Sequence, residues 1–249
     1  MELNGFLFWP AAVAAAVLVG LSKGGLPLVG MLATPVLALF LPPVTAAGLL
    51  LPVYVVSDVF GLWAYRRRFS PRILAILVPA TTAGVGLGWA TAAAVPERLV
   101  TALVGLIGLS FSLNLLLRKQ DGATAKPAAI GPGAFWGTIA GFTSFVSHAG
   151  APPYQVYVLP QRLEKTVFAG TTTILFAYVN AIKLIPYWAL GQLSAGNLKT
   201  AAALLLPAAL AVFAGVKLVR VIPQALFYKL IAWALLAVSL KLLWDAALG

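Results

Sequence analysis

The chain has 249 residues, of which 61% are hydrophobic and 9% charged, and its mean hydropathy is +0.98. This composition excludes an ordinary soluble domain and is typical of a polytopic membrane protein. The formal net charge of +11 does not indicate a nucleic-acid partner, because the basic residues are scattered through short loops between apolar segments. The lack of cysteine excludes disulfides and thiolate metal sites, and a single histidine argues against a histidine-built metal cluster.

Ten apolar runs predict an all-α polytopic membrane protein, because a helix needs roughly 20 residues to span a bilayer. In chain order the runs cover 6–21, 26–41, 44–64, 73–94, 99–117, 131–147, 151–159, 167–190, 198–219 and 225–244. Two pairs of runs are short, and each pair flanks a polar break: S-K-G-G-L-P at 22–27 or S-H-A-G-A-P at 147–152. Each short pair is expected to form a re-entrant hairpin or two short helices that meet inside the membrane.

The loops predict an orientation, because lysine and arginine are concentrated in those that would face one side. Arg98, Lys199 and Lys241 face the other side. By the positive-inside rule, the side rich in basic residues is cytoplasmic, so both termini are expected on the non-cytoplasmic side of a bacterial-type inner membrane. The basic side carries Arg66, Arg67, Arg68, Arg72, Arg118, Lys119, Lys126, Arg162, Lys165, Lys217 and Arg220.

The two halves of the chain also resemble each other. At an offset of 125 residues the two breaks align, and at an offset of 122 Asp58 matches Asn180 and Tyr65 matches Tyr187. Matches in the same order across nearly half the chain indicate duplication, with repeats at 1–125 and 126–249 that together form one membrane domain. Each repeat has an odd number of crossings, so the second is expected to be inverted relative to the first. Inverted repeats with broken helices are typical of secondary transporters, which bind substrate where the breaks meet.

Each break is expected to present the start of a helix, at Pro27 in the first half and at Pro152 in the second. The unpaired N–H groups at two such helix starts would form a site for an anion, beside the charge of Lys23 and the imidazole of His148. The candidate substrate-binding residues are Ser22, Lys23, Gly24, Gly25, Ser147, His148, Gly150, Asn180 and Lys183.

Structural roles are alternatives for these residues. Lys23 could extend to the cytoplasmic interface, and His148 could be a hydrogen-bonded core residue. The glycines could serve only helix packing, and Ser22 and Ser147 could bond to their own helices.

Further polar residues lie within apolar runs, where charge is costly without a partner. Asp58 lies about two turns before the arginine cluster, and Asn180 and Lys183 share a helix face at i, i+3 spacing. An ion pair between Asp58 and Lys183 is expected, either to fix helix packing or to serve the substrate. Four polar residues that bracket the second break could donate to an anion or to a neighbouring helix: Thr143, Ser144, Gln155 and Tyr157.

No catalytic set is evident in the sequence. Asp58, Glu97, Glu164 and His148 lack the spacing of a metal site, and neither a G-x-S-x-G elbow nor the spacing of a P-loop is present. The chain is therefore not expected to be an enzyme, and no cofactor is expected.

Three stretches carry a family resemblance. They are G-L-S-K-G-G-L-P at 20–27, S-F-V-S-H-A-G-A-P-P-Y-Q-V-Y-V-L-P at 144–160 and F-A-Y-V-N-A-I-K-L-I-P-Y-W-A-L-G-Q-L at 176–193. Together they resemble the sulfite exporter TauE/SafE family, also called TSUP, across essentially the whole chain. The resemblance implies a duplicated permease for small sulfur-containing or organic anions such as sulfite or a sulfonate. Ala149 departs from the glycine-rich pattern of the first break, where Gly24 stands, so the two breaks are not equivalent.

The leading hypothesis is a secondary transporter, an exporter, that moves such an anion by alternating access. His148 or Asp58 is a candidate for proton coupling, and uncoupled export down the membrane potential fits equally well. A passive anion channel is the alternative function. The lipid bilayer and the small anion are the expected partners, and the sequence predicts no oligomeric state.

Overall fold

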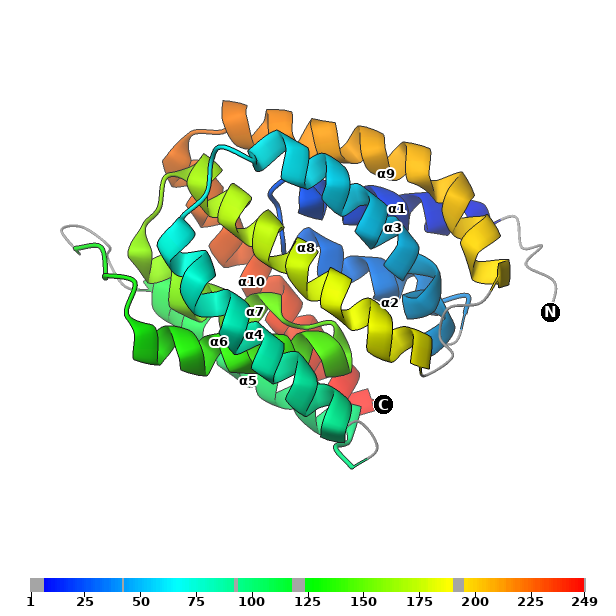
Figure 1. The fold of residues 1–249 in the computed structure, drawn as a ribbon, viewed down its shortest axis with the longest axis horizontal. Helices are drawn as coiled ribbons and strands as arrows, with labels where there is room; N and C mark the ends of the chain where they lie inside the picture. The colour runs from blue at the N-terminus through cyan, green and yellow to red at the C-terminus, as the bar shows by residue number, and fades with distance from the viewer. Residues whose placement is uncertain (1–6, 42, 92–93, 118–123, 190–194, 249) are drawn as a thin grey trace.

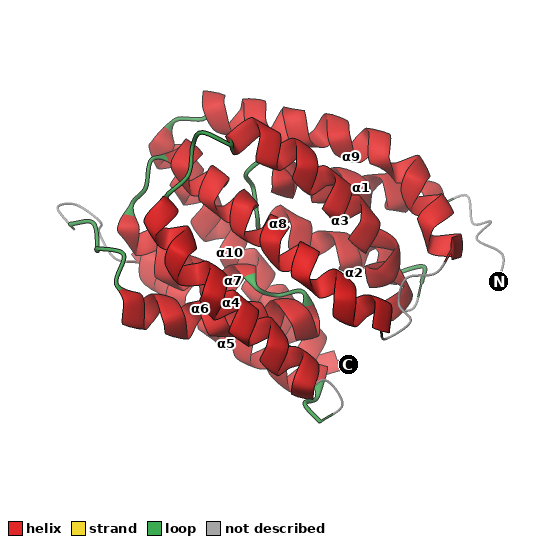
Figure 2. Cartoon of the chain, in the orientation of Figure 1, coloured by secondary structure: helices red, strands yellow, loops and turns green. Residues whose placement is uncertain are grey.

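The computed structural model describes residues 7–41, 43–91, 94–117, 124–189 and 195–248, and every regular element in these ranges is a helix (Figure 2). The predicted all-α class is therefore confirmed. The elements are α1 (Phe8–Lys23), η1 (Val29–Leu32), α2 (Ala33–Ala38), α3 (Pro43–Tyr65), α4 (Pro71–Thr91), α5 (Glu97–Leu117), α6 (Ile130–Ser147), α7 (Ala151–Val158), η2 (Leu159–Gln161), α8 (Lys165–Ala189), α9 (Ala195–Val221) and α10 (Gln224–Leu248).

Six of the described helices are long and apolar enough to cross a membrane: α3 from Gly48 onward, α4, α5, α8, α9 and α10. The chain is accordingly a multi-pass membrane protein. Large apolar side chains such as Trp63, Trp89 and Trp188 lie exposed on the outside of the bundle, as expected for helices that face lipid. The helices of the two predicted short pairs, α1 with α2 and α6 with α7, are not among the six.

The two breaks have different local structures. At the first, Gly25 adopts a φ of +111°, which glycine tolerates because it has no Cβ. The expectation that a helix begins at Pro27 is wrong, because residues 24–28 form a non-helical connection with turns at 24–25 and 27–28, η1 follows, and α2 begins only at Ala33. At the second break α7 begins at Ala151 with Pro152 in its first turn, as predicted. Here His148 makes the turn, with a left-handed φ of 52°.

The two breaks lie within the bundle, whereas other described connections between helices lie at its ends (Figure 1). The α3–α4, η2–α8 and α9–α10 connections lie together at what we call the basic end, because Arg66–Arg68, Arg162 and Arg220 belong to it. The α4–α5 connection and the end of α10 lie at the opposite end (Figure 1). The described basic loops thus lie toward one end of the bundle, while Arg118 and Lys119 of the predicted set lie outside the described residues, and the side that this end faces stays a prediction.

Small residues let the helices of the bundle approach closely. α1 packs along α9, and α4 packs along α6. A Cβ added to Gly24 would lie only 2.6 Å from the carbonyl oxygen of Val212 and 2.7 Å from the Cα of Gly215. Contacts between backbones of this kind are typical of helix pairs in membranes. They hold the first break against α9, while α3 and α8 pack against each other.

Candidate functional site

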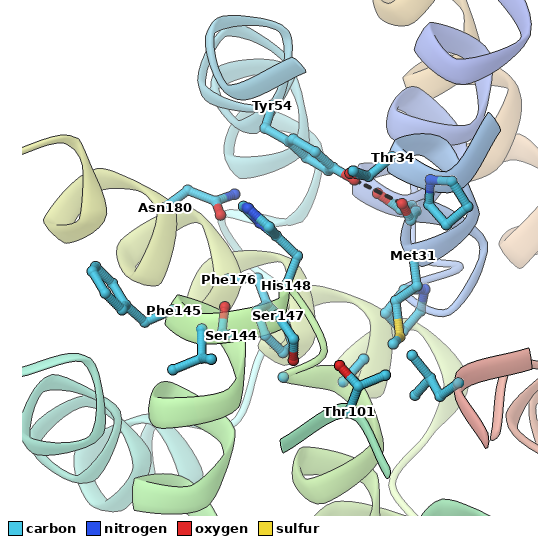
Figure 3. A pocket seen from close by; sticks show the side chains of 18 of the residues that line it. Met31, Thr34, Tyr54, Thr101, Ser144, Phe145, Ser147, His148, Phe176 and Asn180 are labelled. Atoms are coloured by element: carbon cyan, nitrogen blue, oxygen red, sulfur yellow. Dashed lines mark hydrogen bonds between the residues drawn. The ribbon is translucent and has the colours of Figure 1, made fainter. Parts of the chain in front are cut away.

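A cavity of about 790 Å³ extends from the opposite end of the bundle into its interior. Its lining begins at the surface, with Leu39 exposed by 78%, and ends at Lys183, which is only 2% exposed. Figure 3 shows side chains such as Met31, Tyr54, Ser144 and Asn180 that come from different helices and line this cavity. We call this space the central cavity.

An ion pair lies at the inner part of the cavity and joins α1 to α3. Lys23, the last residue of α1, places its Nζ 2.7 Å from Oδ1 of Asp58, and both side chains are nearly inaccessible, with 5% and 6% of their surface exposed. The other carboxylate oxygen, Oδ2, accepts a hydrogen bond of 2.8 Å from Nδ2 of Asn180 on α8. The carboxylate of Asp58 therefore connects three helices, and the predicted ion pair between Asp58 and Lys183 is wrong.

Lys183 takes a different position, beside the second break. Its Nζ donates to the carbonyl oxygen of Ser144 at 3.1 Å and to the hydroxyl of Ser144 at 3.3 Å. It also lies 5.9 Å from the centre of the Tyr187 ring. Among the described residues, no salt bridge includes Lys183. In the described part of the chain, the buried charged residues are thus two lysines and one carboxylate, and in their charged forms these groups carry one uncompensated positive charge.

Each break is held by a tyrosine at the end of a long helix. Tyr65, the last residue of α3, donates to the carbonyl oxygen of Gly24 at 2.7 Å. Tyr187, near the end of α8, is hydrogen-bonded to Nε2 of His148 at 2.8 Å. The His148 imidazole therefore has a polar partner inside the protein, while it also lines the central cavity.

The predicted serines have local partners, as the alternative interpretation expected. The hydroxyl of Ser22 donates to Val19 at 2.7 Å, and that of Ser147 donates to Thr143 at 3.2 Å. Both residues still line the central cavity. Their hydroxyl oxygens remain able to accept hydrogen bonds, because each donates its proton to its own helix.

The structure brings together most of the predicted site residues but not all of them. The cavity lining includes Ser22, Lys23, Ser147, His148, Gly150, Asn180 and Lys183. Gly24 and Gly25 instead lie behind the cavity, against α9 and Tyr65. Tyr157 donates to Ala129 at 3.1 Å. Gln155 is fully buried, and its side-chain amide has no hydrogen-bond partner among the described residues.

Several residues that line the cavity were not predicted from the sequence. Tyr54 lies with its ring centre 5.1 Å from Nζ of Lys23, and its hydroxyl donates to Gly30 at 2.7 Å. A tyrosine within an otherwise apolar run was the available signal for it. The mouth of the cavity carries four more charged residues, none of which was a predicted site residue: Glu97, Arg98, Lys241 and Asp245.

Six described helices that could span a membrane surround a cavity with charged side chains in its lining, which defines the class of multi-pass membrane proteins with a polar interior cavity. The family model described as sulfite exporter TauE/SafE matches residues 12–242, nearly the whole chain. The protein belongs to this family, which is a family of transporters and not of enzymes. Searches of curated proteins and of solved structures returned no match.

Proposed function

We propose that the protein is a secondary transporter that exports a small sulfur-containing or organic anion, such as sulfite or a sulfonate, by alternating access. The observation that carries the proposal is the charge balance of the interior. Lys23 is paired with Asp58, whereas the nearby Lys183 has only the neutral oxygens of Ser144 as polar partners among the described residues. An uncompensated charge at this depth is costly, so an anion that enters the cavity would gain the interaction that Lys183 lacks.

The proposed substrate site consists of the cavity-lining groups around Lys183. Its ammonium group would supply the charge, and the amide of Asn180 and the imidazole of His148 would supply further polar contacts. Lys23 would contribute less, because Asp58 already neutralises it. The cavity, at about 790 Å³, has room for a small oxyanion together with water.

Two inverted repeats, 1–125 and 126–249, would supply the moving parts. The packing supports this proposal: α1 packs on α9 while α6 packs on α4, and α3 packs on α8 while α5 packs on α10. If α1, α3, α4 and α5 of the first half correspond to α6, α8, α9 and α10 of the second, exchanging the halves turns the α1–α9 contact into the α6–α4 contact. The same exchange leaves the α3–α8 and α5–α10 contacts unchanged. The matched residues Asp58 and Asn180 are hydrogen-bonded to each other, as residues near a pseudo-two-fold axis would be.

The cavity supports one state of an alternating-access cycle. It opens at the opposite end, whereas at the basic end Tyr65 and the first break pack together. If the basic end is cytoplasmic, as the positive-inside rule predicts, this state is open to the outside. Rocking one repeat against the other would close this cavity and open a path at the basic end. Coupling could involve a proton on His148 or Asp58, or export could follow the membrane potential alone.

Efflux from proteoliposomes tests the function. Vesicles are loaded in parallel with sulfite, sulfate, thiosulfate, a sulfonate and a carboxylate. The release of each anion is compared with its release from equally loaded vesicles that contain no protein. We expect release of at least one sulfur-containing or organic anion. If folded protein releases none of them, the proposal is wrong. Currents in a planar bilayer far above transporter turnover would instead favour the passive anion channel.

A further inference from the structure

A second, smaller depression of about 420 Å³ lies at the basic end of the bundle. It is formed where α3 ends, α8 begins and α9 ends. The residues around it are Ala64, Tyr65, Arg68, Glu164, Lys165, Thr166 and Arg220. Three of these side chains carry a positive charge and one carries a negative charge, so the net charge of the depression is positive.

The single carboxylate of the depression is engaged by the helix behind it. Glu164 accepts hydrogen bonds from the backbone N–H groups of Thr166 and Val167, and from the hydroxyl of Thr166. Partial burial raises the pKa of Glu164, but these hydrogen bonds and the charge of Arg68 outweigh it and leave the pKa below its usual value. Glu164 therefore stays ionised as a cap on α8. It forms no salt bridge with Arg68 or Arg220.

The three basic residues of the depression differ in what their side chains contact. Lys165 donates from Nζ to the carbonyl oxygens of Arg220 at 2.8 Å and Ile222 at 2.5 Å, so it holds the connection between α9 and α10. Arg68 and Arg220 are exposed, and among the described residues neither guanidinium takes part in an ion pair. Two arginines thus remain at the rim to meet an anion from solution.

Tyr65 links this depression to the first break, which adjoins the central cavity. Tyr65 lines the depression and donates to Gly24, whose neighbour Lys23 lines the central cavity. The contact is tight, because a Cβ added to Gly25 would lie 2.7 Å from the Tyr65 hydroxyl oxygen and 2.7 Å from Cβ of Ala169. A movement of Tyr65 away from the Gly24–Gly25 turn would therefore loosen the contact between the depression and the backbone next to Lys23.

We propose that this depression is an anion-binding vestibule, in which the substrate docks on Arg68 and Arg220 before the contact between Tyr65 and Gly24 opens. The proposal rests on the transport function proposed above and adds a second binding site for the same small anion. The two mouths differ in charge, because the opposite mouth carries two acidic and two basic residues, with Lys241 paired to Asp245 at 2.6 Å. The positive charge of the depression would raise the local concentration of an anion at the basic end, whereas the charges at the opposite mouth cancel.

Basic residues at this end could serve only to orient the protein in the membrane. The test therefore compares two double variants that remove the same amount of positive charge, one inside the vestibule and one outside it. Arg68→Gln with Arg220→Gln changes the vestibule, and Arg67→Gln with Lys217→Gln changes exposed residues outside it. Initial rates of sulfite transport from the basic side are measured against sulfite concentration, at low and at high salt, in vesicles of one orientation. A single cysteine introduced in place of Lys126 reports that orientation, because the natural chain has none.

We expect the vestibule variant to raise the half-saturating sulfite concentration about threefold to tenfold at low salt, with an unchanged maximal rate. The control variant should change it less than about twofold. Equal effects in both variants, or no effect in either, would overturn the vestibule while leaving the transport function intact. A wild-type protein that moves no anion would instead remove the proposed function itself, and the vestibule with it.

Discussion

Asp58→Asn tests the charge balance of the interior. The substitution preserves the size of the side chain but removes the carboxylate that pairs with Lys23, so two interior lysines remain without a negative partner among the described residues. Breaking a buried ion pair by removing one partner typically costs about 3–5 kcal/mol. For a chain of this length, each kcal/mol lowers the melting temperature by about 2–4 °C, so we expect a loss of roughly 6–20 °C.

The assay is thermal unfolding of the purified protein in detergent, with the double variant Lys23→Met, Asp58→Asn measured alongside. Removing both charges should restore at least half of the lost stability, because no uncompensated charge is added relative to the wild type. Sulfite should stabilise the Asp58→Asn protein more than the wild type, since the variant site has one more positive charge. A melting temperature within about 2 °C of the wild type, or additive losses in the double variant, would refute the reasoning.

Two further substitutions test how the breaks are held. Gly24→Val should destabilise the protein by about 1–3 kcal/mol, because a Cβ there meets the backbone of α9 at Val212; a melting curve identical to the wild type would contradict the close packing. Tyr187→Phe should cost about 0.5–1.5 kcal/mol, because the hydrogen bond to His148 is lost while the ring remains. The same thermal assay measures this loss, and an increase in stability would show that this bond does not hold the second break.

The sequence predicted the helices well because bilayer-spanning segments must be long, apolar and separated by polar loops. The predicted runs 73–94 and 99–117 correspond to α4 and α5 within a few residues at each end. The first break was harder to predict. A proline after glycines usually marks the start of a helix, but the positive φ of Gly25 and the turns that follow delay α2 to Ala33. Packing of the Gly24–Gly25 turn against α9 and Tyr65 decides this geometry, and local sequence does not encode it.

The candidate site was predictable in its residue types but not in its pairings. Buried charges in apolar runs identified Asp58 and Lys183, because such residues are rare without a function or a partner. Which lysine pairs with Asp58 depends on how α1, α3 and α8 pack, and the structure places Lys23 there. The position of Tyr54, the mouth of the central cavity and the depression at the basic end also depend on helices far apart in sequence, so a single sequence gives little signal for them.

The most direct test of the account is sulfite efflux from proteoliposomes that contain the Lys183→Met variant. The substitution keeps the length and apolar stem of the side chain and removes the charge that lacks an acidic partner among the described residues. Losing a charged hydrogen-bond donor costs about 1.5–3 kcal/mol, so we expect efflux at subsaturating sulfite to fall by roughly 10- to 150-fold. Lys199→Met, an exposed lysine on α9, serves as the control and should transport normally. Wild-type efflux from folded Lys183→Met protein would contradict the proposed anion site.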